Sequence, residues 1–170
     1  MDQKSIRRLV ECALLIAIGT VLSLFDFKGP WALGGGITVC SMLPLVMIAH
    51  RHGTKWGVIS ALLYSLLQLL LGLSNVQYAP NALVAVGIIA LDYVLAFTVI
   101  GFSACFNHVI KDRRWSIVAG IAVTLSWAPA LWSFVYNGSY MLPEIIITAL
   151  AAFVSYAPLK RFWTGEDLAK

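Results

Sequence analysis

The chain has 170 residues, of which 60% are hydrophobic and 12% charged, with a net charge of +4 and a mean hydropathy of +0.85. Soluble domains carry about 25% charged residues, so this composition excludes an ordinary soluble domain and indicates a single transmembrane domain over residues 1–170. The basic residues lie in short segments between apolar runs, where they set membrane orientation. Nucleic-acid binding is therefore not expected.

The first apolar run, residues 9–25, is long enough for one helical crossing, which takes about 17–25 residues. Small residues four positions apart form a flat strip that another helix can approach closely. The run holds two such pairs, Ala13 with Ala17 and Gly19 with Ser23. Their spacing leaves open whether the strips meet another protein or pack within this one.

Residues 26–36 are expected to form an outer loop, because Pro30 and three consecutive glycines break helices. Trp31 in this loop fits either an anchor at the membrane interface or part of a flap over a site. A second, shorter apolar run covers residues 37–49. Pro44 within it is expected to kink the helix near the middle of the membrane.

Titratable side chains lie close to the ends of these runs. Glu11 is placed to pair with Arg7, four residues earlier on the same helix. His50 and His52 follow the second run in a basic turn that is expected to face the lipid headgroups. Their spacing and the lack of a third ligand nearby argue against a metal site.

The third apolar run covers residues 56–72 and contains Gln68, which is expected to bond to a neighbouring helix or to line a cavity. Residues 73–80 are expected to form an outer loop. Residues 81–105 form the next run, with Asp92 near its middle and Tyr93 directly after it. A carboxylate at that depth costs about 2.5–3.5 kcal/mol, so it is expected to serve a cavity or ligand, or else to hold neighbouring helices together.

The last apolar stretch, residues 116–159, carries one charged residue, Glu144. At about 1.5 Å per residue it is long enough for two crossings of about 30 Å with almost no loop between them. Pro129 and the pair Asn137-Gly138 are the expected break points.

The positions of the basic residues predict the membrane topology. Cytoplasmic loops of membrane proteins are enriched in Lys and Arg. All Lys and Arg residues except Lys28 fall at the two ends of the chain or in alternate segments between the apolar runs. The pattern predicts an all-α integral membrane protein with six transmembrane helices and both termini in the cytoplasm.

This topology places carboxylates and aromatic residues in the outer half of the bundle. Aromatic rings with a carboxylate shielded from water form a good trap for an organic cation, although an interfacial belt explains some of the rings. The sequence contains no catalytic motif and no nucleotide-binding motif. Neither enzyme activity nor a cofactor is expected, and any energy coupling must come from a partner or an ion gradient. The candidate ligand residues are Trp31, Asp92, Tyr93, Trp127, Trp132, Tyr136, Asn137 and Glu144.

Residues 34–72 resemble the GG-x-x-T-x-x-SM-x-P…G-x-x-x-G block of thiamine-specific S-components, the substrate-binding subunits of energy-coupling factor transporters. The stretches around Leu91-Asp92-Tyr93 and Tyr136-Asn137-Gly138 also resemble that family. The resemblance implies a multi-pass protein of the bacterial plasma membrane, with an outward-facing vitamin pocket that uses Asp92, Tyr93 and Asn137. It also implies docking through Ala13 and Ala17 to a transmembrane T-component driven by two cytoplasmic ATPase subunits.

The resemblance weakens after Gly120. Family members have a longer fifth helix and following loop, with a histidine that stacks on the ligand, and this chain runs directly into Tyr136. Trp127 or Trp132 is expected to replace the stacking ring. The leading interpretation is thiamine binding and uptake as an S-component. The alternatives are the same architecture with a thiamine precursor or another flat vitamin, and a helical membrane scaffold without transport.

Overall fold

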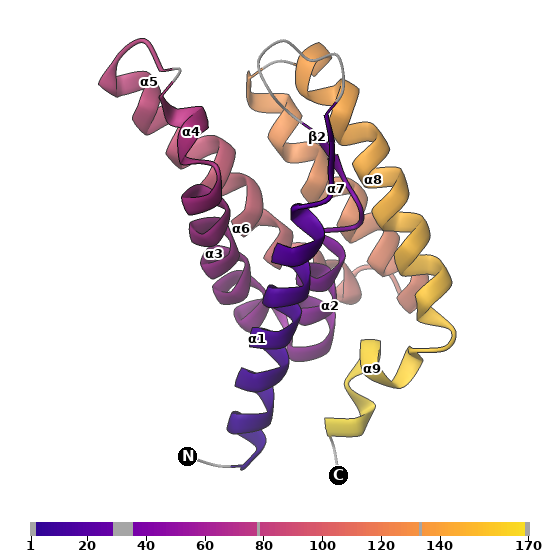
Figure 1. The fold of residues 1–170 in the computed structure, drawn as a ribbon. Helices are drawn as coiled ribbons and strands as arrows, with labels where there is room; N and C mark the ends of the chain where they lie inside the picture. The colour runs from indigo at the N-terminus through magenta and orange to yellow at the C-terminus, as the bar shows by residue number, and fades with distance from the viewer. Residues whose placement is uncertain (1–2, 29–35, 78, 133, 169–170) are drawn as a thin grey trace.

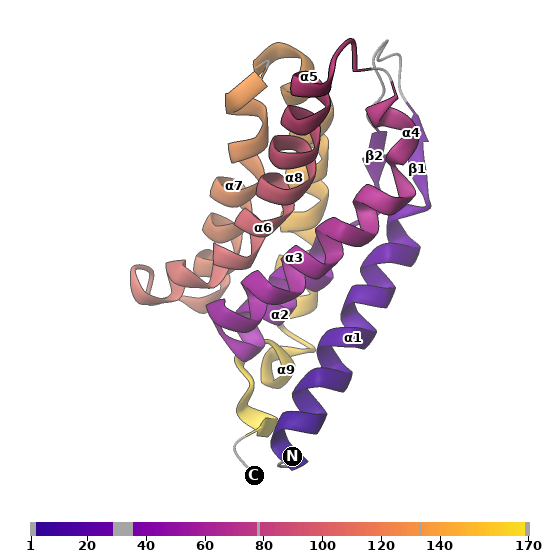
Figure 2. The same ribbon diagram turned by 90° about the vertical axis from the view of Figure 1, so that its left-hand side faces the viewer.

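The computed structural model describes residues 3–28, 36–77, 79–132 and 134–168, and these residues are mostly helical (Figure 1). Both ends of the chain lie at one end of the bundle, which we call the terminal end (Figures 1 and 2). β2, α5 and the junction of α7 with α8 lie at the opposite, distal end. The principal helices are α1 (Gln3–Ser23), α2 (Leu43–His52), α3 (Thr54–Leu71), α5 (Ala82–Gly87), α6 (Ala96–Ile100), α7 (Arg113–Trp132) and α8 (Phe134–Tyr156).

The outer surface of the bundle is apolar. Two described helices are long and apolar enough to cross a membrane, Thr54–Leu71 and the continuous run Ala82–His108. Large aliphatic side chains such as Leu14, Ile18 and Leu70 are exposed. Water would disfavour such a surface, whereas a lipid bilayer would cover it.

The segment between α1 and α2 differs from the expected loop and helix. β1 (Asp26–Lys28) pairs antiparallel with β2 (Gly36–Thr38), so the helix expected over residues 37–49 is wrong in its first half. α2 has ten residues and is about 15 Å long, half the thickness of a hydrocarbon core. The expected kink at Pro44 is also wrong, because Pro44 lies in the first turn of α2, where its missing N–H removes no helical hydrogen bond.

The fourth helical run changes its winding along its length. α5 leads into the π-helix η1 (Ile88–Leu95), which is followed by α6 and the 3₁₀-helix η2 (Gly101–His108). Between α3 and this run, the short α4 (Leu73–Val76) lies where only a loop was expected. A π-helix is rare and often marks a functional position.

α7 and α8 pack against each other along their lengths. Both expected break points between them are wrong, because Pro129 lies in the last turn of α7 and Asn137-Gly138 lies in the first turns of α8. The missing N–H of Pro129 removes one helical hydrogen bond, and α7 nevertheless continues to Trp132. The chain finishes with α9 (Lys160–Thr164) and η3 (Glu166–Leu168), which fold back under α2.

The core lies where α2, α3, η2, α7 and α8 cross. Small residues let the backbones approach there, as is usual for membrane helices. A Cβ atom on Gly57 would lie 2.7 Å from the carbonyl oxygen of Gly101, and one on Gly120 would lie 2.6 Å from that of Ser103. The largest fully buried side chains of the core include Tyr64, Leu45, Ile48, Ile117, Ile121 and Trp163.

Candidate functional site

Glu144 lies buried in α8 and binds the last residue of β2. One carboxylate oxygen, Oε2, accepts a hydrogen bond from the backbone N–H of Thr38 at 2.8 Å, and the other, Oε1, accepts one from the Thr38 hydroxyl at 2.7 Å. The Thr38 hydroxyl also shares a 2.6 Å hydrogen bond with Ser41. Glu144 therefore fastens the end of β2 to α8 at the distal end.

Asp92 and Tyr93 lie on the π-helix η1, and their side chains have different environments. Asp92 is exposed and, within the part of the chain that the structure describes, forms no hydrogen bond or ion pair. The Tyr93 hydroxyl donates to the carbonyl oxygen of Gly72 at 3.1 Å, and a Cβ on Gly72 would collide with this hydroxyl. Tyr93 thus ties the fourth helical run to the end of α3, whereas the Asp92 carboxylate is available.

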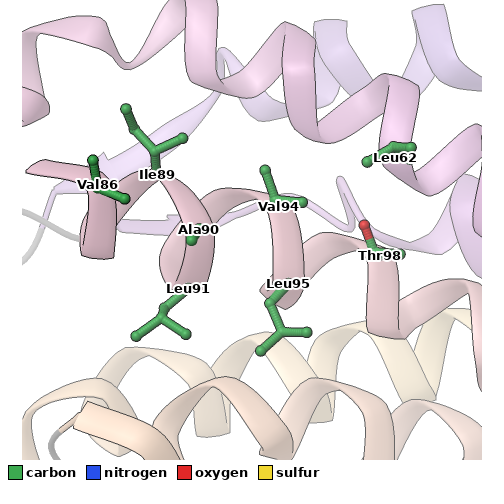
Figure 3. Close-up of a pocket in the computed structure, with 8 residues that line it drawn as sticks. All are labelled: Leu62, Val86, Ile89, Ala90, Leu91, Val94, Leu95 and Thr98. Carbon is green, nitrogen blue, oxygen red and sulfur yellow. The ribbon is translucent and has the colours of Figure 1, made fainter.

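A cavity of about 540 Å³ lies between α3 and the fourth helical run (Figure 3). Ile89 and Val94 lie on the side of the run that faces Leu62 of α3, while Leu91 and Leu95 point away from it (Figure 3). Thr98 is the only polar side chain in the described lining, so the cavity suits hydrocarbon and lacks a group that would hold a cation. The lining residues are Leu62, Val86, Ile89, Ala90, Leu91, Val94, Leu95 and Thr98.

Four of the remaining predicted ligand residues lie near the junction of α7 and α8. Trp127 and Trp132 lie in the last turns of α7, and Tyr136 and Asn137 lie in the first turns of α8. The fold therefore brings the backbone of these four residues to the end of the bundle where Glu144 holds β2 (Figure 1). Trp31 lies outside the described residues.

The two pairs of small residues on α1 have different surroundings. Gly19 packs inside the protein, since a Cβ there would lie 3.0 Å from the carbonyl oxygen of Ser41. Ser23 accepts a 2.7 Å hydrogen bond from Gln68 of α3, which confirms that Gln68 bonds to a neighbouring helix. Ala13 and Ala17 are exposed beside a groove of about 430 Å³ that α1 forms with Leu63, Leu66, Leu67 and Leu70 of α3.

The terminal end holds an ion network that sequence reasoning found only in part. The expected pair of Arg7 and Glu11 is present at 2.9 Å. At its centre, however, is Arg51, whose side chain is 0% exposed and which binds both Glu11 and Asp167. Hydrogen bonds from Arg51 lower the pKa of Asp167 to about 2. The apolar pair Phe162-Trp163 before Asp167 was the available signal that the tail packs against the bundle.

The histidines of the basic turn are buried, so the expectation that they face the headgroups is wrong. The ring of His50 lies edge-on to Trp163, with centroids 6.1 Å apart, and His52 Nε2 lies 3.0 Å from a Glu11 oxygen. Burial, followed by the charge of Arg113, lowers the pKa of His50 to about 3. Among the described residues, no three His, Cys, Asp or Glu side chains are grouped to hold a metal ion.

Comparison with known proteins gives three related findings. A family model described as thiamine transporter protein (Thia_YuaJ) matches residues 9–127. The thiamine transporter ThiT of Bacillus subtilis (strain 168) is 27% identical over 195 aligned positions, covering 97% of this chain and 98% of that protein. A solved structure of ThiT from Listeria monocytogenes has the same fold, with a TM-score of 0.61, 20% identity and 98% coverage of both chains.

The ends of these matches agree with the shortening expected from the sequence. The family match stops at residue 127, in the region where the chain departs from the family pattern. The alignment to the Bacillus subtilis protein spans 195 positions, more than the 170 residues of this chain, so that protein contains stretches that are missing here.

Proposed function

The chain belongs to the thiamine transporter protein family, a family of membrane transporters and not of enzymes, and we propose that it binds thiamine as the substrate-binding S-component of an energy-coupling factor transporter. The observation that carries this proposal is Asp92. It is an exposed carboxylate on an apolar helix that belongs to the region matched by the family model. Such a charge is costly in a membrane unless a cation offsets it.

Thiamine combines a cationic thiazolium ring with an aminopyrimidine ring, and Asp92 has the chemistry to bind either. Its carboxylate would pair with the thiazolium charge or accept a hydrogen bond from the aminopyrimidine. Trp127, Trp132 and Tyr136 would stack on the rings from the junction of α7 and α8, where Asn137 adds an amide. Trp31, which lies in the sequence between β1 and β2, is a further proposed ligand residue.

Tyr93 and Glu144 are expected to form the walls of this site. Both already bond within the protein, Tyr93 to Gly72 and Glu144 to Thr38. A ligand that bound these two side chains directly would have to replace these hydrogen bonds. Otherwise it would contact only the segments that the two side chains hold in place. Their contribution is therefore expected to be smaller than that of Asp92.

Uptake also needs an energy source, and this chain carries no nucleotide motif. The proposed partners are a transmembrane T-component and two cytoplasmic ATPase subunits. The exposed pair Ala13 and Ala17, beside the groove between α1 and α3, supports docking by a partner helix. In this arrangement six crossings in the plasma membrane place both termini in the cytoplasm.

Binding of radiolabelled thiamine to the detergent-purified protein tests the ligand. Saturable binding that unlabelled thiamine competes away is the expected result. Stronger competition by an isolated aminopyrimidine or thiazole precursor would replace thiamine with that precursor as the ligand. A folded protein without saturable binding of any of these compounds would leave the helical scaffold as the function.

Co-purification with the T-component and its ATPases tests the docking surface. Ala13→Trp or Ala17→Trp is expected to abolish complex formation, because the bulk of the indole blocks close helix approach, and to leave thiamine binding intact. Leu14→Trp is the matched control, since Leu14 is exposed on the same helix and is not part of the groove. Equal effects of all three substitutions would show that α1 does not dock through this pair.

A further inference from the structure

The guanidinium group of Arg51 is saturated by acceptors from both ends of the chain. An arginine side chain has five N–H donors. Its Nε and Nη2 donate to the two oxygens of Glu11 at 2.8 and 3.1 Å, and its Nη1 and Nη2 donate to the two oxygens of Asp167 at 2.6 and 2.7 Å. The fifth bond, at 2.8 Å, goes from Nη1 to the carbonyl oxygen of Phe162. Arg51 of α2 therefore joins α1 to the C-terminal segment.

The C-terminal segment, residues 160–168, has a conformation that brings it to this arginine. The ring of Phe162 lies 3.9 Å from the Arg51 guanidinium carbon, and Trp163 is completely buried. Gly165 then adopts a left-handed conformation, with φ at +68°, and turns the chain so that Asp167 faces Arg51. A Cβ on Gly165 would lie 2.9 Å from the Arg51 carbonyl oxygen, so only glycine fits this turn.

The first turns of α1 have little else to hold them. None of the described residues before Cys12 is buried, so packing does not fix this part of the helix. Its ties are polar: Arg7 bonds to Asp167 at 2.5 Å and to Glu11 at 2.9 Å, and Glu11 bonds to Arg51. The C-terminal segment thus supplies one side of the contact that holds the start of α1.

The direction of Glu11, together with the buried side chains of Cys12, Leu15 and Ile16, determines which face of α1 points outward. Successive helical residues are rotated by about 100°, so Ala13 and Ala17 lie roughly 200° and 240° around the axis from Glu11. When Glu11 points inward to Arg51, this pair points outward, as observed. A rotation of α1 that broke the Glu11 contacts would turn the pair away from its present position.

We propose that the C-terminal segment is a clasp that, together with this packing, fixes the rotation of α1 and so keeps the face of Ala13 and Ala17 presented to the membrane partner. Asp167 is the positioning residue of the clasp. This inference rests on the proposed docking function. It adds that docking depends on a segment joined to α1 through ionic contacts at the terminal end, where Arg7 and Asp167 are 160 residues apart in sequence.

Asp167→Asn is the test, with Glu166→Gln as the matched control. Glu166 is a neighbouring exposed carboxylate that forms no ion pair with Arg51 or Arg7, and its substitution changes the net charge equally. Asp167→Asn is expected to weaken capture of the T-component and ATPases by about fivefold or more, because the amide carries no charge to pair with the two guanidinium groups and its NH₂ group cannot accept their hydrogen bonds. Thiamine affinity should stay within about twofold, and the control should change neither quantity.

The companion variants separate the two proposals. If Ala13→Trp leaves complex formation intact, docking through α1 is wrong and the clasp has no role in it. If Ala13→Trp blocks the complex and Asp167→Asn does not, only the clasp is wrong. Equal losses of thiamine binding and docking in Asp167→Asn would also overturn the clasp proposal, because they would show a general effect on folding. Should Asp167→Asn not fold, Arg7→Gln, which leaves Arg51 with its acceptors, is expected to weaken docking in the same direction.

Discussion

Arg51 and Asp92 are charged side chains among apolar helices, and their surroundings differ. Arg51 is fully buried with two carboxylates and a carbonyl oxygen around it, whereas Asp92 is exposed without a partner among the described residues. Removing one partner of a buried ion pair leaves an uncompensated charge and costs about 3–5 kcal/mol. Removing an unpaired carboxylate from an apolar helix has no such cost. Substitution of Arg51 should therefore lower the stability of the protein, whereas substitution of Asp92 should weaken ligand binding.

Asp92→Asn is predicted to weaken thiamine binding without destabilising the protein. The amide keeps the shape and removes the charge, so a charge-assisted contact of about 1.5–3 kcal/mol becomes a neutral one of about 1 kcal/mol. The expected loss is about 1–2 kcal/mol, or roughly 5–30-fold in affinity. Affinity and thermal stability are measured on the same preparation. Unchanged affinity with lowered stability would mean that Asp92 only holds helices together.

The stability of the protein is predicted to fall as the pH decreases below about 6.5. Burial holds the pKa of His50 at about 3, against an ordinary value of 6.5. Between these values the unfolded chain binds a proton that the folded chain does not, so acid favours unfolding. Asp167, with a pKa of about 2 against 3.8, adds stability above pH 3.8 that is lost as the pH falls toward 2.

Thermal unfolding of the purified protein between pH 8 and pH 4 measures this dependence. The melting temperature should be nearly constant above about pH 6.5 and should fall below it. His50→Phe removes the titrating group and keeps a ring against Trp163, so the fall between pH 6.5 and 4 should become smaller. His108→Gln is the control, because His108 is exposed. An unchanged slope in His50→Phe would contradict the prediction.

At the level of elements, the sequence predicted the helices whose apolar runs are long and missed the structures that depend on distant contacts. The runs that became α3 and the fourth helical run are helical over nearly their predicted ranges. The β-ribbon was missed because Thr38, in β2, bonds to Glu144, which is 106 residues away in sequence. The π-helix at Asp92 was missed because its residues have the same composition as an ordinary apolar helix.

Two glycines of the fourth helical run are predicted to respond oppositely to alanine. A Cβ on Gly101 would lie 2.5 Å from the Val58 backbone, so Gly101→Ala overpacks the crossing with α3 and should cost about 1–3 kcal/mol. A Cβ on Gly87 would have no atom within 4 Å, and the backbone angles there are helical, so Gly87→Ala should add about 0.5–1 kcal/mol.

Chemical or thermal unfolding of the two alanine variants measures these changes in stability. The sign of the difference is the informative result, because helix propensity alone would stabilise both proteins. Similar stabilisation by both substitutions would contradict the close approach of η2 to α3.

At the level of the whole molecule, the sequence predicted which residues belong to the candidate site, but it did not predict the contacts that these residues form. The positions of Asp92 and Glu144 on separate helices followed from hydropathy and charge. The internal bonds of Glu144 and Tyr93 did not, because they depend on how the helices lie together. The ion network was invisible for the same reason: Glu11 and Asp167 are 40 and 116 residues from Arg51. The periodicity of hydrophobic residues predicts single helices or strands, and it does not reveal pairs of residues that are distant in sequence.

The orientation of the molecule in the membrane is the last prediction. The two ends of the chain lie at the same end of the bundle, and α5 lies at the other (Figures 1 and 2). The excess of Lys and Arg in the segments at the terminal end assigns that end to the cytoplasm.

In a variant without native cysteines, Leu83→Cys on α5, where the native side chain is 83% exposed, should react with an impermeant maleimide in intact cells. Gln3→Cys and Glu166→Cys should react only after permeabilisation, because both positions are exposed at the terminal end. Labelling of both end positions in intact cells, with Leu83→Cys protected, would show the inverted orientation. Labelling of one end alone would show an odd number of crossings.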